Sequence, residues 1–178
     1  MLVYLMADPD FCNLLLDKCV ITAKEFAKAQ IEAGCQIIGI GDAICSQIDT
    51  LTYDTYIKER HREIIGHIHD CGGKVKLHIC GNITHLLSSI SELGVDILDV
   101  DYQVDMDEAY TMMGSDVIRC GNINPVLVEE RSAEEIFQAT SMLVEKEKGR
   151  KFMISAGCEI TVNTLYENLM AMRKASIL

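Results

Sequence analysis

Apolar positions along this chain follow two alternating periods, one helical and one typical of buried strands. Residues 8–33 repeat apolar side chains every three or four positions, which predicts one long amphipathic helix that ends at Gly34. Residues 36–41 form a short apolar run followed by Asp42, which is typical of a buried strand that leads into a polar loop. The first third of the chain therefore predicts a helix and then a strand.

The same alternation continues to the end of the chain. Four further strands are predicted, at residues 74–79, 96–100, 117–120 and 151–155. Helices are expected at residues 53–70, 84–93 and 106–113, from Ser132 onward with a capping box, and at 165–174. Strands that alternate with helices at this spacing imply parallel strands joined by right-handed crossovers. Residues 1–178 are thus expected to form a single α/β domain with about five βα units.

Two architectures fit this pattern: an open doubly wound sheet and part of a (β/α)₈ TIM barrel. A complete barrel needs eight strands and about 250 residues, whereas only five strands are predicted in these 178 residues. In either architecture, sites are built after the carboxyl ends of the strands. Asp42, Asp101 and Asn122 each follow a predicted strand, so they are candidate substrate-binding residues.

The strand at residues 74–79 ends in a pair of potential metal ligands. His78 and Cys80 are two residues apart, and because a strand repeats every two residues, both point to the same face. Cys158 follows the last predicted strand in the same way. Catalytic zinc typically takes three protein ligands and keeps the fourth position open. We therefore predict that His78, Cys80 and Cys158 hold one zinc ion at which a thiol is activated.

A second interpretation of these residues remains open. Free cysteine is among the most buried residue types, so Cys80 and Cys158 would also suit a plain core, with His78 as a hydrogen-bonded neighbour. The predicted metal site also depends on the fold, because a flat sheet would hold the two strands roughly 14 Å apart. His67 and Cys71 form a second His/Cys pair on a predicted helix, but no third ligand is in view. The remaining histidines, His61, His69 and His85, are expected on helix surfaces.

Charge and cysteine usage narrow the class of protein. The formal net charge is −11 without a basic cluster, which disfavours nucleic acids and anionic membranes as partners. The eight cysteines are scattered through helical and strand-like segments, and the amino end shows no signal-peptide pattern. No apolar run approaches the roughly 20 residues of a membrane span. A soluble protein in the reducing cytoplasm is expected.

Several stretches together resemble the uroporphyrinogen decarboxylase superfamily, whose members fold as (β/α)₈ barrels. These stretches are Gln30-Ile-Glu-Ala-Gly34, Gly94-Val-Asp-Ile-Leu98, Gly121-Asn-Ile-Asn-Pro125 and Thr164-Leu-Tyr-Glu-Asn168. His78-Ile-Cys80-Gly-Asn82 with Ser155-Ala-Gly-Cys158-Glu looks like the zinc branch of that superfamily, the methylcobamide:coenzyme M methyltransferases. The resemblance spans nearly the whole chain and corresponds to the carboxyl-terminal part of the barrel.

The resemblance implies methyl transfer from a methylated corrinoid, held by a separate carrier protein, to a thiol such as coenzyme M or to a related acceptor. It assigns His78, Cys80 and Cys158 as the zinc ligands, and Glu159 becomes a candidate for tuning the site or binding substrate. Lys76 stands where the Asp-x-His-x-x-Gly signature of corrinoid carriers needs Asp, so the chain is not expected to be the carrier. A second chain or self-association is expected to complete the barrel, because open strand edges are normally covered.

Two other functions are kept beside methyl transfer. The chain could be a non-catalytic barrel fragment or interaction module, for which metal content is the discriminating measurement. It could also be a metal-free enzyme like the decarboxylases, which would need arginines to bind tetrapyrrole carboxylates, and Arg119 is the one arginine near a predicted strand end.

Overall fold

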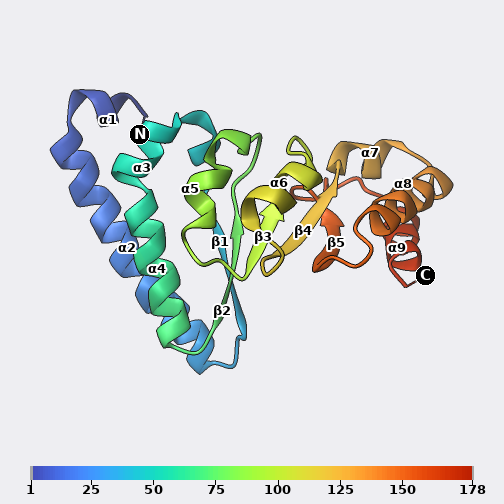
Figure 1. Ribbon diagram of the computed structural model, residues 1–178, viewed down its shortest axis with the longest axis horizontal. Helices are drawn as coiled ribbons and strands as arrows, with labels where there is room; N and C mark the ends of the chain where they lie inside the picture. The colour runs from blue at the N-terminus through green and yellow to red at the C-terminus, as the bar shows by residue number, and fades with distance from the viewer. Residues whose placement is uncertain (1, 178) are drawn as a thin grey trace.

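The computed structural model describes residues 2–177, which form a five-stranded sheet with helices along one side (Figure 1). The strands are β1 (Ile37–Gly41), β2 (Lys74–His78), β3 (Ile97–Val100), β4 (Ile118–Ile123) and β5 (Phe152–Ala156). All neighbouring pairs are parallel, and the spatial order follows the sequence, β1-β2-β3-β4-β5. A doubly wound sheet would reverse its strand order, so the sheet is part of a (β/α)₈ barrel wall.

Helices connect every pair of consecutive strands, as right-handed parallel crossovers require. The α-helices are α1 (Leu2–Ala7), α2 (Pro9–Glu32), α3 (Thr50–Tyr56), α4 (Lys58–Asp70), α5 (Leu87–Ser91), α6 (Met106–Met113), α7 (Pro125–Glu130), α8 (Ala133–Lys146) and α9 (Tyr166–Ala175). Two short 3₁₀ helices are η1 (Cys45–Gln47) and η2 (Thr84–Leu86). Helices α1 and α2 lie at one end of the sheet and α8 and α9 at the other (Figure 1).

The predicted helix ends agree with local capping chemistry in several places. The Asp8 side chain accepts a hydrogen bond from the Phe11 amide at the start of α2, and Pro9 occupies the first helical position. Ser132 and Glu135 form the predicted capping box of α8. These residues satisfy amide groups that no helical carbonyl can reach.

The prediction of one continuous helix at residues 53–70 was wrong, because α3 and α4 are separate helices. Ile57, between them, has φ −115° and ψ −44°, which lies outside the ordinary helical range. The Asp49 side chain caps α3, which therefore begins before Tyr53. Helices α1 and α7 were not predicted from the periodicity, since segments of six residues carry little periodic signal.

The main hydrophobic core lies between the sheet and the helices that cover its convex side. Val75 and Leu77 of β2 and Leu98 of β3 are fully buried there, against residues such as Ile65 and Ile68 of α4. Side chains that alternate with these face the concave side, which is the inside of a barrel. This alternation places Lys76 and His78 on the concave side of β2.

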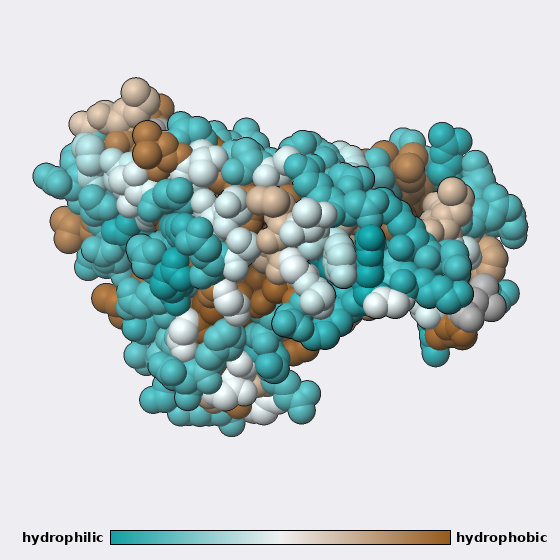
Figure 2. Space-filling model, in the orientation of Figure 1, coloured by the Kyte–Doolittle hydropathy of each residue, from teal (hydrophilic) through white to brown (hydrophobic). Residues whose placement is uncertain are grey.

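Exposed apolar side chains gather at the two ends of the sheet. Figure 2 shows a mostly hydrophilic face with hydrophobic residues over α1 and α2 at one end and near α8 and α9 at the other. Val3, Met6 and Phe11 belong to the first group, and Met142 and Tyr166 to the second. Among residues 2–177, no helix combines the length and apolar character needed to cross a membrane.

Candidate metal centre

His78 and Cys80 reach the carboxyl end of the barrel wall because β2 ends there. His78 is the last residue of β2, and the strand alternation buries its neighbours Leu77 and Ile79 on the helix side. The chain turns at Gly81, whose φ of +88° is a left-handed conformation that glycine adopts without a steric penalty. Both side chains are half-buried and open toward the concave side.

Cys158 reaches the same place from β5, on the far side of two intervening strands. Its neighbour Gly157 packs directly on the backbone of Tyr102, so closely that a Cβ atom at this position would overlap the Tyr102 amide. The Gly157 amide also donates a 2.8 Å hydrogen bond to the Ile123 carbonyl of β4. The absence of a side chain at residue 157 therefore lets the loop that carries Cys158 lie against the β3 loop.

The three predicted ligand side chains converge. The Sγ atoms of Cys80 and Cys158 are 3.6 Å apart, and His78 Nε2 is 3.1 Å from the Cys80 Sγ. All three ligand atoms lie within 4.8 Å of one another, and no other group of three or more potential metal ligands occurs among residues 2–177. A flat sheet would separate β2 and β5 by roughly 14 Å, so it is the curvature of the wall that brings these residues together.

A hydrogen bond orients the His78 ring for ligation. His78 Nδ1 lies 3.1 Å from the Asp99 carbonyl oxygen, so Nδ1 carries the proton and donates it there. In the neutral imidazole the other nitrogen, Nε2, then has a free lone pair, and it faces Cys80. Metal-bound histidines almost always have their second ring nitrogen fixed by such an outer partner. The donor set and its orientation therefore fit a zinc ion.

A buried carboxylate lies near the Cys80 sulfur atom. Partial burial, the contact with Cys158 and the negative charge of Asp101 raise the pKa of Cys80 to about 11. Asp101 is 2% exposed, and its carboxylate accepts hydrogen bonds from the Gly81 and Gln103 amides. A divalent cation would offset the repulsion between two thiolates and this carboxylate.

The other predicted site residues surround the centre without joining it. The Asn122 amide donates to the Val104 carbonyl at 2.8 Å, which braces the loop after β3. The Asp42 carboxylate turns to the helix side, where it accepts hydrogen bonds from Cys45 and His61. Glu159 is exposed beside Cys158. None of these side chains belongs to the three-ligand group.

His61 was expected on the helix surface, and that prediction was wrong. Its side chain is 6% exposed and hydrogen-bonds to the buried Tyr53 hydroxyl at 3.0 Å. The signal was present in the sequence, since His61, Ile65 and Ile68 follow the helical spacing of one buried face. His67 and Cys71, whose Nε2 and Sγ atoms are 3.7 Å apart, have no third ligand among the described residues.

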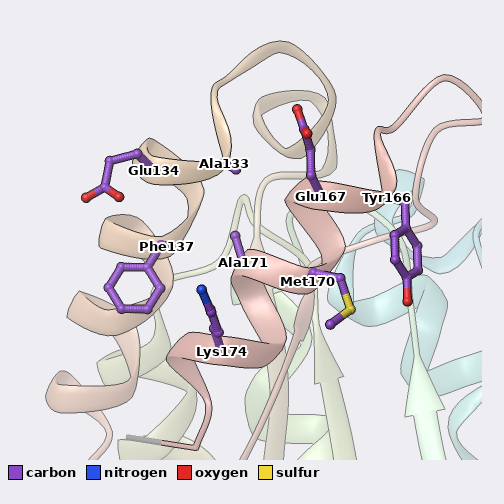
Figure 3. A pocket seen from close by; sticks show the side chains of 8 residues that line it. All are labelled: Ala133, Glu134, Phe137, Tyr166, Glu167, Met170, Ala171 and Lys174. Atoms are coloured by element: carbon purple, nitrogen blue, oxygen red, sulfur yellow. The ribbon is translucent and has the colours of Figure 1, made fainter.

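A separate groove lies outside the barrel wall, between α8 and α9 (Figure 3). It has a volume of about 600 Å³, and it combines Phe137 and Ala171 with Lys174, while the Glu134 carboxylate points away from it. None of the three candidate metal ligands lines this groove. The chemistry-bearing residues are therefore at the strand ends and not in the groove.

Comparison with known proteins relates this arrangement to one family. The model of a family described as uroporphyrinogen decarboxylase (URO-D) matches residues 1–176. The uroporphyrinogen decarboxylase of Prochlorococcus marinus (strain MIT 9515) is 28% identical over 163 residues, which are 90% of this chain and 46% of that protein. The methylcobamide:CoM methyltransferase MtbA of Methanosarcina acetivorans is 30% identical over 161 residues, 89% of this chain and 46% of that protein.

A solved structure shares the fold. A methyltransferase from Methanosarcina mazei superposes with a TM-score of 0.89 at 22% identity, covering 99% of this chain and 52% of that one. The chain therefore spans about half the length of the curated relatives and of the solved structure that it matches.

Proposed function

The chain belongs to the uroporphyrinogen decarboxylase family, and we propose that it is a zinc-dependent methyltransferase, or the zinc-bearing part of one. In this proposal it moves a methyl group from a methylated corrinoid, held by a separate carrier protein, to a thiol such as coenzyme M or a related acceptor. The likeness to the MtbA methyltransferase supports this branch of the family. The proposal assigns the protein to a reducing cytoplasm, where both thiols stay available.

One observation carries the proposal: the meeting of His78, Cys80 and Cys158 at the carboxyl ends of nonadjacent strands. Two cysteines and one histidine form a known catalytic zinc set with an open fourth position. When bound there, zinc would supply a site that lowers the pKa of an incoming thiol and keeps its sulfur nucleophilic. The protein residues fix this site through the Asp99 carbonyl and the Asp101 carboxylate.

The proposed reaction is a nucleophilic displacement. The lone pair of the acceptor thiolate forms a carbon–sulfur bond as the cobalt–carbon bond breaks, and both electrons of that bond remain on cobalt, which becomes Co(I). The thiol proton passes to solvent. Asp42, Asp101, Asn122 and Glu159 remain predictions as substrate contacts, with Glu159 the most accessible to an acceptor.

Further strands would be needed to enclose a substrate. Among the described residues, β1 and β5 each pair on one side alone. We propose that additional polypeptide, a separate chain or a second copy pairs with these edges and closes the barrel around the centre. The proposed methyl transfer depends on this closure of the barrel.

A metal-free decarboxylase is the second candidate, and the similarity to the Prochlorococcus marinus decarboxylase favours it. Arg119, the arginine that could have bound a substrate carboxylate, is instead 0% exposed and paired with Glu147 at 2.7 Å. A non-catalytic interaction module is the third candidate. Neither alternative requires two thiols and an imidazole to face one another.

The test combines metal analysis with a methyl-transfer assay. The purified chain should contain one equivalent of zinc, and once added strands complete the barrel it should demethylate free methylcobalamin in the presence of coenzyme M under anaerobic conditions. Formation of cob(I)alamin and methylated thiol, both dependent on zinc, would support the proposal. A chain without zinc would exclude the metal site, and zinc without methyl transfer, even with added barrel strands, would exclude the reaction.

A further inference from the structure

A second polar cluster lies on the helix side of β1, next to the candidate metal centre. It contains Asp42, Cys45, Tyr53 and His61. His61 Nε2 lies 3.3 Å from one Asp42 carboxylate oxygen, and the Cys45 thiol donates to the same oxygen at 2.9 Å. His61 Nδ1 lies 3.0 Å from the Tyr53 hydroxyl. The imidazole therefore links a fully buried tyrosine to the carboxylate at the end of β1.

This cluster lacks a reactive nucleophile. Cys45 is 1% exposed, and burial together with the Asp42 charge raises the pKa of its thiol far above the ordinary value. Burial also raises the pKa of Tyr53. Burial raises the pKa of Asp42 too, but hydrogen bonds from His61 and Cys45 outweigh it and hold that pKa below its usual value. The cluster thus holds a fixed carboxylate anion in place.

The fixed Asp42 lies directly against the loop that carries Cys80. Its backbone amide donates a 3.0 Å hydrogen bond to the carbonyl of His78. Four residues further on, Ser46 of η1 packs on Gly81, where an added Cβ would come within 3.1 Å of the Ser46 hydroxyl. The segment from Asp42 to Ser46 therefore touches the metal loop on both sides of Cys80.

We propose that His61 is a positioning residue for the metal centre, an inference that rests on the proposed function. His61 holds the Asp42 carboxylate, Asp42 holds the turn from β1 into η1, and that turn supports the backbone on each side of Cys80. Loss of the imidazole would allow this turn to shift and the Cys80 sulfur to leave its place opposite Cys158. His61 acts on the centre through Asp42 and does not touch the metal itself.

The test measures zinc affinity in the whole chain, by competition with a chromophoric chelator, for three variants. His61→Leu removes both hydrogen bonds, and its side chain has room because His61 borders a cavity of about 230 Å³ between α2 and α4. His61→Gln keeps an amide donor for Asp42. His69→Leu makes the same change on the exposed side of α4, where His69 contacts Asp96 at the opposite end of the wall.

We expect His61→Leu to weaken zinc binding by about 10- to 100-fold, the usual cost of losing an outer-shell partner. His61→Gln should restore most of the affinity, and His69→Leu should leave affinity unchanged even where it lowers thermal stability. In the cobalt(II)-substituted protein, the ligand-field spectrum of His61→Leu should depart from the wild-type tetrahedral pattern, and that of His61→Gln should match it.

Wild-type zinc affinity and a wild-type cobalt spectrum in His61→Leu would overturn the inference, and so would equal losses in His61→Leu and His61→Gln. If His61→Leu does not fold, Tyr53→Phe replaces it, because it removes the hydroxyl partner of Nδ1 and should weaken zinc binding by a smaller factor. Wild-type protein that binds no zinc would overturn both the proposed function and this inference. Zinc binding without methyl transfer, even with added barrel strands, would overturn the proposed function alone.

Discussion

The two ends of the barrel wall arrange their polar side chains in opposite ways. At the amino ends of the strands, charges are paired: Lys74 and His69 both contact Asp96, at 2.8 and 2.9 Å, and Lys151 contacts Asp116 at 3.1 Å. At the carboxyl ends, two thiols and an imidazole face one another beside the Asp101 carboxylate.

This difference separates residues that stabilise the fold from residues that offer chemistry. A satisfied ion pair has little capacity left for a ligand, and exposed pairs contribute modestly to stability. A group of electron-pair donors with no cation among them is instead complementary to a metal ion. Changes at the carboxyl ends should therefore alter zinc binding, and changes at the amino ends should alter stability without altering zinc binding.

The largest effect is expected from Cys80→Ser. A serine hydroxyl does not replace a thiolate as a zinc ligand. Zinc affinity should therefore fall by more than about 100-fold, which is the most that loss of an outer-shell partner usually costs. Methyl transfer should be lost with it. Cys35→Ser, an identical change at an exposed cysteine between α2 and β1, is the control and should bind zinc as wild type does. Retained zinc in Cys80→Ser, measured by elemental analysis, would remove Cys80 from the site.

The next effect concerns the loop that places Cys158. In Gly157→Ala the new methyl group would overlap the Tyr102 backbone, and such overpacking typically costs about 1–3 kcal/mol. We expect a lower midpoint in urea and weaker zinc binding together, because the shift moves Cys158 away from Cys80. Gly66→Ala, in the middle of α4 with open space around it, is the control. It should stabilise the protein by about 0.5–1 kcal/mol and leave zinc binding unchanged.

The contrast between the two ends also explains what could be predicted from sequence. Strand alternation was enough to place His78 and Cys80 on one face, and the order of strands and helices was enough for a βα-repeat fold. The choice of a barrel over a doubly wound sheet needed the spatial strand order, since periodicity reports burial and not which strands are neighbours.

Contacts between distant segments could not be predicted from local pattern. The closeness of Cys80 to Cys158 depends on sheet curvature and on Gly157 packing against Tyr102, and no short-range signal encodes either. His61 was misassigned because residue type alone does not place histidine, which is intermediate in its tendency to be buried, although its spacing with Ile65 and Ile68 matched the buried face.

At the amino ends, Asp96→Asn should cost about 1 kcal/mol at neutral pH, since the carboxylate accepts bonds from Lys74, His69 and the Val75 amide but both charged partners are exposed to solvent. Partial burial raises the pKa of Asp96, but these hydrogen bonds outweigh it and hold the pKa below its usual value. A lowered folded-state pKa stabilises the protein above the unfolded value near 4. That contribution is lost as the pH falls through the folded-state pKa.

The difference in unfolding free energy between wild type and Asp96→Asn should therefore shrink in acid, as followed by urea denaturation at several pH values. Zinc affinity should be the same in both proteins at neutral pH. Weaker zinc binding in Asp96→Asn would contradict the separation of the two ends.

The last prediction concerns the pH dependence of zinc binding itself. Because burial and neighbouring negative groups raise the pKa of Cys80 to about 11, its thiol holds a proton at neutral pH. Zinc binding must release that proton, so affinity should rise by at least about tenfold per pH unit between pH 6 and roughly 8 and should fall as the solution is acidified. Competition titrations across this range measure the slope.

Asp96→Asn, which changes only the opposite end of the wall, should give the same slope. A pH-independent affinity would mean that no thiol loses a proton on binding, and the ion would then be held by groups other than Cys80 and Cys158.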